Sequence, residues 1–243
     1  MIKDIEKIMA ELAKNSDRII VTPKTLEELK RLGIPFDVIP APTIEELFEI
    51  RKQNALVKVK NLPALPQGLP PEIQALYQEI RECILFGLNG AAITMSSILI
   101  EFVLKHTTFI KEAGGYQNID PQKWDKFERM EFGKAINLAK RVGILDSEMA
   151  RRLNSFRETI RNPYIHYNIK KITENVVAKN VKQVDTETGE IKETDIEAKS
   201  SPMIQAQAKP LMDKHHVINV FCFADEVVKY LLPQLKDKEV ELF

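Results

Sequence analysis

The sequence predicts a mainly α-helical protein: a helical bundle, a small α/β-like unit at the N-terminal end and a β-hairpin inserted before the last helix. Apolar residues recur at helical spacing through the middle of the chain and again near its C-terminal end. Prolines crowd one short segment, and a charged segment without helical periodicity precedes the last helix. The predicted divisions are an N-terminal unit at residues 1–60, a Pro-rich linker at 61–71, and a helical domain at 72–235 that carries the insertion at 175–201.

The N-terminal unit is predicted from two short strand-like runs, DRIIVTP and IPFDVIP, which alternate with helix starts. Each helix start carries a capping box, Thr25 with Glu28 and Thr43 with Glu46, in which a hydroxyl and a carboxylate accept from backbone N–H groups. The linker is predicted from proline, which fixes φ and removes a backbone donor. It marks the clearest domain boundary in the sequence.

The helical domain is predicted to pack around the run AAITMSSILIEFVLKH, which is apolar on nearly all sides. Asp146 is placed to cap the helix SEMARRLNSFRETIRN. The insertion is expected to form a hairpin turning at Thr188-Gly189, with a disordered segment as the alternative. Tyr116 and Trp124 fall in a predicted Gly-rich loop, where an aromatic side chain either anchors the loop or stacks on a base.

Composition is that of an ordinary globular protein, with 44% hydrophobic and 29% charged residues. Lys and Arg number 35, as do Asp and Glu, so nothing global marks a binder of nucleic acid or membranes, and any basic site must be local. Cys83 and Cys222 lie far apart in apolar runs, which indicates buried free thiols and a reducing compartment. No segment is long and apolar enough to predict a membrane span, so we expect a cytoplasmic protein without a membrane partner.

The segment IRNPYIHYN holds the residues best suited to chemistry: Arg161, Asn162 and His166. Cleavage of RNA requires proton transfer from the 2′-hydroxyl and to the leaving 5′-oxygen, for which histidine suits neutral pH. The planar fork of arginine matches the oxygens of a phosphorane, and asparagine can orient the imidazole or hold a phosphate. This chemistry needs neither a metal nor a cofactor, and the sequence contains no dense cluster of carboxylates, cysteines or histidines.

A locally basic strip surrounds this segment. From residue 151 to residue 171 six basic residues stand against one acidic residue, a local charge of +5 in a chain of zero net charge. Such a strip is expected to attract phosphates. Besides Arg161, the candidate RNA-binding residues are Arg151, Arg152, Arg157, Lys170 and Lys171.

Structural roles for the same residues compete with catalysis. Arginines on a helix face are usually solvated, and Arg-Asn-x-x-x-His arises by chance in roughly one chain in a hundred of this length. Glu101 lies in an otherwise apolar helix, and a buried carboxylate needs a partner. An arginine from the basic strip is the expected partner, in a structural salt bridge rather than in catalysis.

Residues 72–171 and the last helix resemble the HEPN family (higher eukaryotes and prokaryotes nucleotide-binding domain). The resemblance rests on ECILFGLNGAAITMSSILIEFVLK, FGKAINLAKRVGILDSEMARRL and IRNPYIHYN, in that order. It implies a HEPN-like helical bundle and a metal-independent endoribonuclease acting on single-stranded RNA, in a toxin or phage-defence setting. It also implies a homodimer in which two copies of Arg161, Asn162 and His166 meet. An antitoxin or a larger defence complex is a further partner that the resemblance suggests.

Two other functions remain open at this point. One is a non-catalytic HEPN module that binds RNA, nucleotide or a protein partner, and the other is an unrelated helical scaffold with a chance motif. Pro163 lies inside the motif, where it disfavours helical geometry at Asn162 and removes a helix hydrogen bond. The expected kink either aims His166 into a cleft or disrupts the site.

Overall fold

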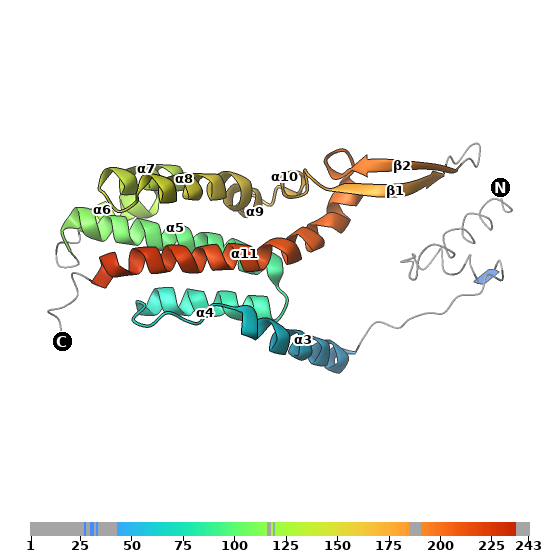
Figure 1. The fold of residues 1–243 in the computed structure, drawn as a ribbon, viewed down its shortest axis with the longest axis horizontal. Coiled ribbons are helices and arrows are strands. Elements are labelled where there is room, and N and C mark those ends of the chain that lie inside the picture. The colour runs from blue at the N-terminus through green and yellow to red at the C-terminus, as the bar shows by residue number, and fades with distance from the viewer. Residues whose placement is uncertain are drawn as a thin grey trace. The chain divides into compact units, whose positions relative to one another are not determined.

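The computed structural model describes residues 43–115, 118, 120–184 and 191–236, together with positions 27, 30, 31 and 33. The described part is mainly helical with one two-stranded antiparallel sheet, which confirms the prediction of a mainly α-helical protein with a hairpin before the last helix (Figure 1). The predicted α/β-like unit lies almost entirely outside the described residues, as do Tyr116 and the expected turn at Thr188-Gly189.

The described residues fall into two compact units. Among the described residues, the helical bundle takes in 45–176 and 197–236, and the hairpin residues 177–196 belong to the other unit. The α-helices are α3 (Ile44–Lys58), α4 (Pro71–Leu85), α5 (Asn89–Ala113), α6 (Pro121–Glu128), α7 (Phe132–Arg141), α8 (Ser147–Phe156), α9 (Asn162–Ile165), α10 (Ile169–Ile172) and α11 (Pro202–Lys236). The remaining elements are the π-helix η3 (Arg157–Arg161), the 3-10 turns η1 (Val59–Asn61) and η4 (Ala198–Ser200), and the strands β1 (Val177–Val184) and β2 (Ile191–Glu197).

Helix boundaries in the bundle follow local signals in the sequence. Asp146 caps α8 as predicted, because its Oδ1 accepts from the Met149 N–H at 2.7 Å. Asp120 caps α6 in the same way, with Pro121 in the first turn. Trp124 therefore lies in a helix, and its predicted placement in a loop is wrong. The last helix, which apolar spacing predicts over DKHHVINVFCFADEVVKYLL (residues 213–232), also begins earlier than predicted, at Pro202, and runs through Pro210.

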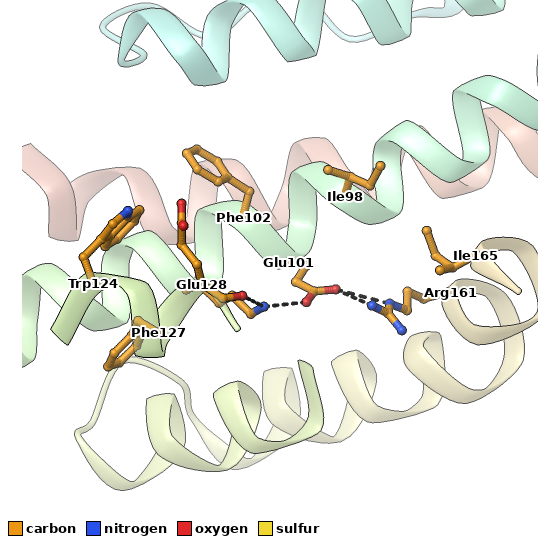
Figure 2. Close-up of a pocket in the computed structure, with 9 residues that line it drawn as sticks. Ile98, Glu101, Phe102, Trp124, Phe127, Glu128, Arg161 and Ile165 are labelled. Carbon is orange, nitrogen blue, oxygen red and sulfur yellow. Dashed lines mark hydrogen bonds and ion pairs between the residues drawn. The ribbon is translucent and has the colours of Figure 1, made fainter. Parts of the chain in front are cut away.

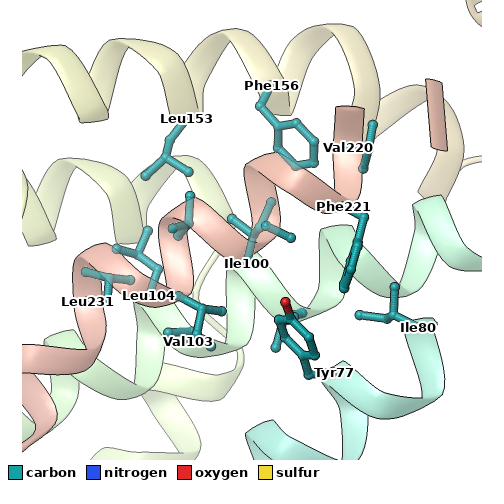
Figure 3. Close-up of a cluster of buried hydrophobic side chains, with 14 of the residues drawn as sticks. Tyr77, Ile80, Ile100, Val103, Leu104, Leu153, Phe156, Val220, Phe221 and Leu231 are labelled. Carbon is teal, nitrogen blue, oxygen red and sulfur yellow. The ribbon is translucent and has the colours of Figure 1, made fainter. Parts of the chain in front are cut away.

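The central helix of the bundle is α5, as its apolar sequence predicts. Figure 1 shows α5 and α11 side by side, with α4 on one side of them and α7 and α8 on the other. Figure 3 shows the core between these helices, where Tyr77, Ile100, Leu153 and Phe221 are completely buried. Burying an aliphatic side chain of this size contributes about 1.5–3 kcal/mol. The core therefore fixes the position of α8 and of the motif segment that continues it.

Among the described residues, α5 alone is long and apolar enough to cross a membrane by length and composition, so the prediction that no segment reaches that limit is wrong. Its most apolar window is 67% buried inside the bundle, as expected of the core helix of a soluble protein. The two cysteines are free thiols as predicted, but Cys83 is only half-buried and Cys222 on α11 is exposed, so the prediction that both are buried is wrong. It occupies the outward side of a helix whose other side fills the core.

The Pro-rich segment at residues 61–71 packs on the bundle. Leu62 and Leu69 are buried in the same core cluster as α4, and Arg81 of α4 donates to the Pro63 carbonyl. Helix α3, which precedes this segment, has no buried residue. The division of the chain at residues 60 and 72 stays a prediction, because most of residues 1–42 lie outside the described part.

The hairpin leaves and rejoins the bundle at one point. The Ala198 N–H donates to the Val176 carbonyl at 2.9 Å, so the two ends of the excursion are hydrogen-bonded to each other. Inside the hairpin, Asn180 adopts a positive φ of 55°, and its N–H donates to Asp195 Oδ1 at 3.0 Å. The predicted insertion is thus an ordered hairpin over its described residues.

Candidate functional site

The motif segment continues α8 through a widened turn. Residues 157–161 form a π-helix, in which the Asn162 N–H donates to the Arg157 carbonyl five residues earlier. Asn162 keeps right-handed helical angles, φ −64° and ψ −46°, so the expected loss of helical geometry before Pro163 is wrong. The wider turn accommodates the proline, which lacks an N–H and stands in the first turn of α9. Single π turns of this kind occur frequently at functional sites.

Arg161 is held by two side chains. Its Nε and Nη2 donate to Glu101 Oε2 at 3.2 and 2.8 Å, and its Nη1 donates to Asn162 Oδ1 at 3.1 Å. The other Glu101 oxygen lies 2.7 Å from Lys105 Nζ. The side chains of Glu101 and Arg161 are only 16% and 21% exposed. The predicted salt bridge of Glu101 with an arginine of the basic strip is therefore present, and its arginine is the candidate catalytic Arg161.

A cavity of about 320 Å³ opens beside this ion pair (Figure 2). Glu101, Lys105 and Arg161 supply its charged end, and aromatic rings from α5 and α6 supply the other end. The lining residues are Ile98, Glu101, Phe102, Lys105, Trp124, Phe127, Glu128, Arg161 and Ile165. The arrangement places a fixed guanidinium at the edge of a space large enough for a small organic group.

His166 lies at the C-terminal end of α9. The Asn168 N–H donates to the Pro163 carbonyl at 2.8 Å, and Tyr167 takes the left-handed angle φ 49° that usually falls to glycine at this position. This turn fixes the backbone of His166, whose side chain is exposed and makes no hydrogen bond or ion pair with any described residue. His166 does not line the Arg161 cavity. Within one chain the structure joins Arg161 and Asn162 and leaves His166 at the surface beside them.

The basic strip is largely paired with carboxylates. Arg152 makes a double contact with Glu226 of α11 at 2.5 and 2.6 Å. That hydrogen bond raises the pKa of Arg152 and lowers the pKa of Glu226. The other pairs are Arg151 with Glu148, Arg157 with Glu158, Arg161 with Glu101 and Lys171 with Glu174. The exposed pairs of Arg151, Arg152 and Lys171 are each worth at most about 1 kcal/mol, so a phosphate can compete for these three cations.

Arg157 has a packing role besides its charge. Its guanidinium lies across Gly133 in the first turn of α7, where a Cβ added to the glycine would overlap it. Its Nε is buried without a hydrogen-bond partner among the described residues. The glycine therefore makes room for the arginine. Of the predicted RNA-binding residues, Arg157 is the one most firmly built into the bundle.

Sequence reasoning missed a second group of polar side chains close to the motif. The buried Tyr164 hydroxyl donates to Asp213 Oδ1 at 2.9 Å, and Lys209 Nζ lies 2.6 Å from the other Asp213 oxygen. Burial first, and then the Asp213 carboxylate, raise the pKa of Tyr164. The only signal in the sequence is the spacing of four between Lys209 and Asp213. Lys209 also lines a cavity of about 440 Å³ with Tyr164 and Tyr167.

No group of three or more His, Cys, Asp or Glu side chains positioned to hold a metal ion occurs in the part of the chain that the structure describes. No protein-family model, no curated protein and no solved structure matches the chain. The resemblance to HEPN domains therefore continues to rest on the three sequence segments that carry it.

Proposed function

We propose that the protein is a metal-independent endoribonuclease of the HEPN type that cleaves single-stranded RNA. The observation that carries the proposal is the fixed Arg161 at the end of η3, held by Glu101 and Asn162 at the edge of a cavity, with His166 exposed at the end of the short helix α9 that follows. An arginine locked before substrate arrives needs little reorganisation to meet a phosphate, which favours electrostatic stabilisation of a transition state.

The proposed reaction uses the RNA's own 2′-hydroxyl as nucleophile. One imidazole removes its proton, the 2′-oxygen attacks the adjacent phosphorus, and an imidazolium protonates the departing 5′-oxygen. The bond from phosphorus to the 5′-oxygen breaks, which leaves a 2′,3′-cyclic phosphate and a 5′-hydroxyl. Arg161 stabilises the charge on the phosphorane oxygens. Asn162 holds the arginine through its side-chain oxygen, at 3.1 Å from Arg161 Nη1.

Two proton-transfer groups are needed, and each chain supplies one His166. We therefore propose a homodimer in which two motif segments face each other across the substrate. The exposure of His166 supports this assembly, because it leaves the imidazole accessible to a second chain. Light scattering should show a dimer at micromolar concentration. A stable monomer would count against the composite site.

Charge at the site is compatible with an RNA phosphate. Glu101 offsets one of the two cations that contact it, Arg161 and Lys105, so this cluster of three keeps one positive charge, although Glu128 on the aromatic side makes the cavity lining as a whole neutral. Exposed Lys170 and the surface cations of Arg151, Arg152 and Lys171 extend this charge beyond the cavity. These residues are proposed to contact the backbone on either side of the scissile phosphate.

The deciding experiment is cleavage of a mixed-sequence single-stranded RNA by protein freed of co-purifying protein and nucleic acid. Cleavage should persist in EDTA and give the cyclic phosphate and 5′-hydroxyl ends. His166→Ala should lower the rate by about 100-fold or more, the usual scale for losing acid–base catalysis. His215→Ala, which changes an exposed histidine of α11, is the matched control and should cleave normally.

A non-catalytic HEPN module that binds RNA, nucleotide or a protein partner is the second candidate. It is favoured by the pairing of Arg161 with Glu101 and of four strip cations with carboxylates, which suits a structural role. Intact RNA after incubation with the wild type, with retained binding, would select this function. In either case we propose a cytoplasmic protein, with an antitoxin or a larger defence complex as its controlling partner.

A further inference from the structure

The end of the Arg161 cavity away from the ion pair is walled by aromatic rings. Trp124 and Phe127 come from α6 and Phe102 from α5. Other rings support this wall from behind: Phe109 packs on Trp124 at 4.9 Å between centroids, and His106 stacks on Phe102 at 5.6 Å. Trp124 and Phe102 are thus held in place while one side of each faces the cavity (Figure 2). A preformed aromatic wall is suited to contact with a flat ring.

A single carboxylate accompanies these rings. Glu128, the last residue of α6, lines the cavity, and Figure 2 shows its side chain on the aromatic side, away from Arg161. Its backbone carbonyl accepts from Lys105 Nζ at 3.0 Å, which anchors the end of α6 to α5. Its carboxylate makes no hydrogen bond or ion pair with any residue that the structure describes. Glu101, by contrast, is occupied by Arg161 and Lys105.

We propose that this cavity binds a guanine base of the RNA substrate. Trp124 and Phe102 contact the faces or edges of the base, Glu128 accepts from its Watson–Crick edge, and the phosphate of the same nucleotide lies toward Lys105 and Arg161. The inference rests on the proposed ribonuclease function and adds a base preference beside the scissile phosphate. Stacking on an aromatic side chain does not discriminate among bases, because every base has a π face. Discrimination must therefore come from Glu128.

A carboxylate distinguishes guanine by its pattern of donors. Guanine presents two adjacent donors on its Watson–Crick edge, the N1–H and the exocyclic amine, which match the two oxygens of a carboxylate. Adenine and cytosine each place an acceptor nitrogen beside their amine, and uracil places carbonyl oxygens on both sides of its single N–H. Each of these three would bring an acceptor against the charge of Glu128. Base edges exposed in single-stranded RNA are the usual targets of such contacts.

Trp124 provides a direct measurement, because it is the only tryptophan of the chain. Its fluorescence should be quenched saturably by guanosine 3′-monophosphate, at concentrations at least ten times lower than those of the adenosine, cytidine and uridine 3′-monophosphates. Glu128→Gln should abolish this preference while some quenching by all four nucleotides remains. Glu79→Gln, on α4 and outside the cavity, is the control and should behave as the wild type. Equal quenching by the four nucleotides, or none, would overturn the inference.

The titration should be repeated with His166→Ala, since base binding does not need the imidazole. Guanosine-selective quenching without RNA cleavage by the wild type would refute the proposed function and keep the guanine site. Cleavage without guanosine selectivity, in the titration and in the mapped cut sites, would refute the guanine site and keep the ribonuclease.

Discussion

The guanidinium of Arg161 donates twice to one oxygen of Glu101, at 3.2 Å from Nε and 2.8 Å from Nη2, while Lys105 holds the other oxygen at 2.7 Å. A carboxylate from the central helix thus sets the position of the candidate catalytic arginine on the motif segment. Glu101 touches no substrate atom in the proposed reaction, so we regard it as a positioning residue.

Glu101→Gln should lower kcat by about 10- to 100-fold, with a smaller change in KM. The loss corresponds to a hydrogen bond to a charged group, about 1.5–3 kcal/mol, at tenfold per 1.36 kcal/mol. Steady-state kinetics on RNA would measure the split. Glu148→Gln is the control, because its pair with Arg151 is exposed and should be worth less than about 1 kcal/mol. Faster cleavage by Glu101→Gln would instead identify Glu101 as an inhibitory clamp.

Pro163→Ala tests the widened turn before α9. An alanine restores the missing N–H, so residues 157–161 no longer need the π-helical path and can return to ordinary helix. The resulting rotation would shift Arg161 against Glu101. Cleavage should fall by about 10- to 100-fold, the scale for a misplaced catalytic group. Circular dichroism should show an unchanged helical fold, and a rate equal to that of the wild type would show that the turn does not aim the site.

Removal of the hairpin should leave the bundle folded. A short Gly/Ser link replacing residues 178–196 spans a point where Val176 and Ala198 are already hydrogen-bonded. We expect a loss of at most about 1 kcal/mol, or 2–4 °C in Tm for a chain of this size. Thermal unfolding followed by circular dichroism would test this. Binding of substrate or partner should change instead, and failure to fold would show that the hairpin is structural.

The buried tyrosines predict sensitivity to alkaline pH. Burial and Asp213 raise the pKa of Tyr164, and burial with the hydrogen bond to Asp225 raises the pKa of Tyr77. A phenol whose pKa is raised in the folded state stabilises the fold below the unfolded value, about 10, and loses this contribution as the pH rises further. Tm should therefore be level near pH 8 and fall above pH 10.

Tyr164→Phe should reduce the slope of that fall, at a cost of about 1 kcal/mol at neutral pH for the lost hydrogen bond. Tyr167→Phe is the control, because Tyr167 is 67% exposed. An unchanged slope for Tyr164→Phe would mean that this phenol does not titrate on unfolding.

The sequence predicted most of the bundle because its signals are local. Apolar spacing marked α5 as the central helix, Asp146 marked the start of α8, and the apolar surroundings of Glu101 predicted an arginine partner. These features depend on periodicity, capping and burial, which a chain displays within a few turns. The start of α11 was predicted too late, because a proline such as Pro210 usually ends a helix, whereas α11 continues through it.

The arrangement of the site was harder to predict because it depends on contacts distant in sequence. The charge of +5 counted along the basic strip ignored Glu226, which lies 74 residues from Arg152 in the chain and beside it in the fold. The cavity joins α5, α6 and the motif segment, and no local pattern shows that Trp124, Glu128 and Arg161 share it. The π turn could not be predicted either. Pro163 predicted a kink at its own position, whereas the structure accommodates the proline by widening the preceding turn, residues 157–161.

The hydrogen bond between Ala198 and Val176 has a consequence for how such a chain can change over time. Because the excursion starts and ends at the same place, a segment of another length or sequence can be exchanged there without altering the path of α10 or α11. The chain would leave and rejoin the bundle at the same two residues after the exchange, so neither flanking helix would have to move. An exchange of the hairpin would therefore leave the helical bundle, and the site proposed on it, unchanged.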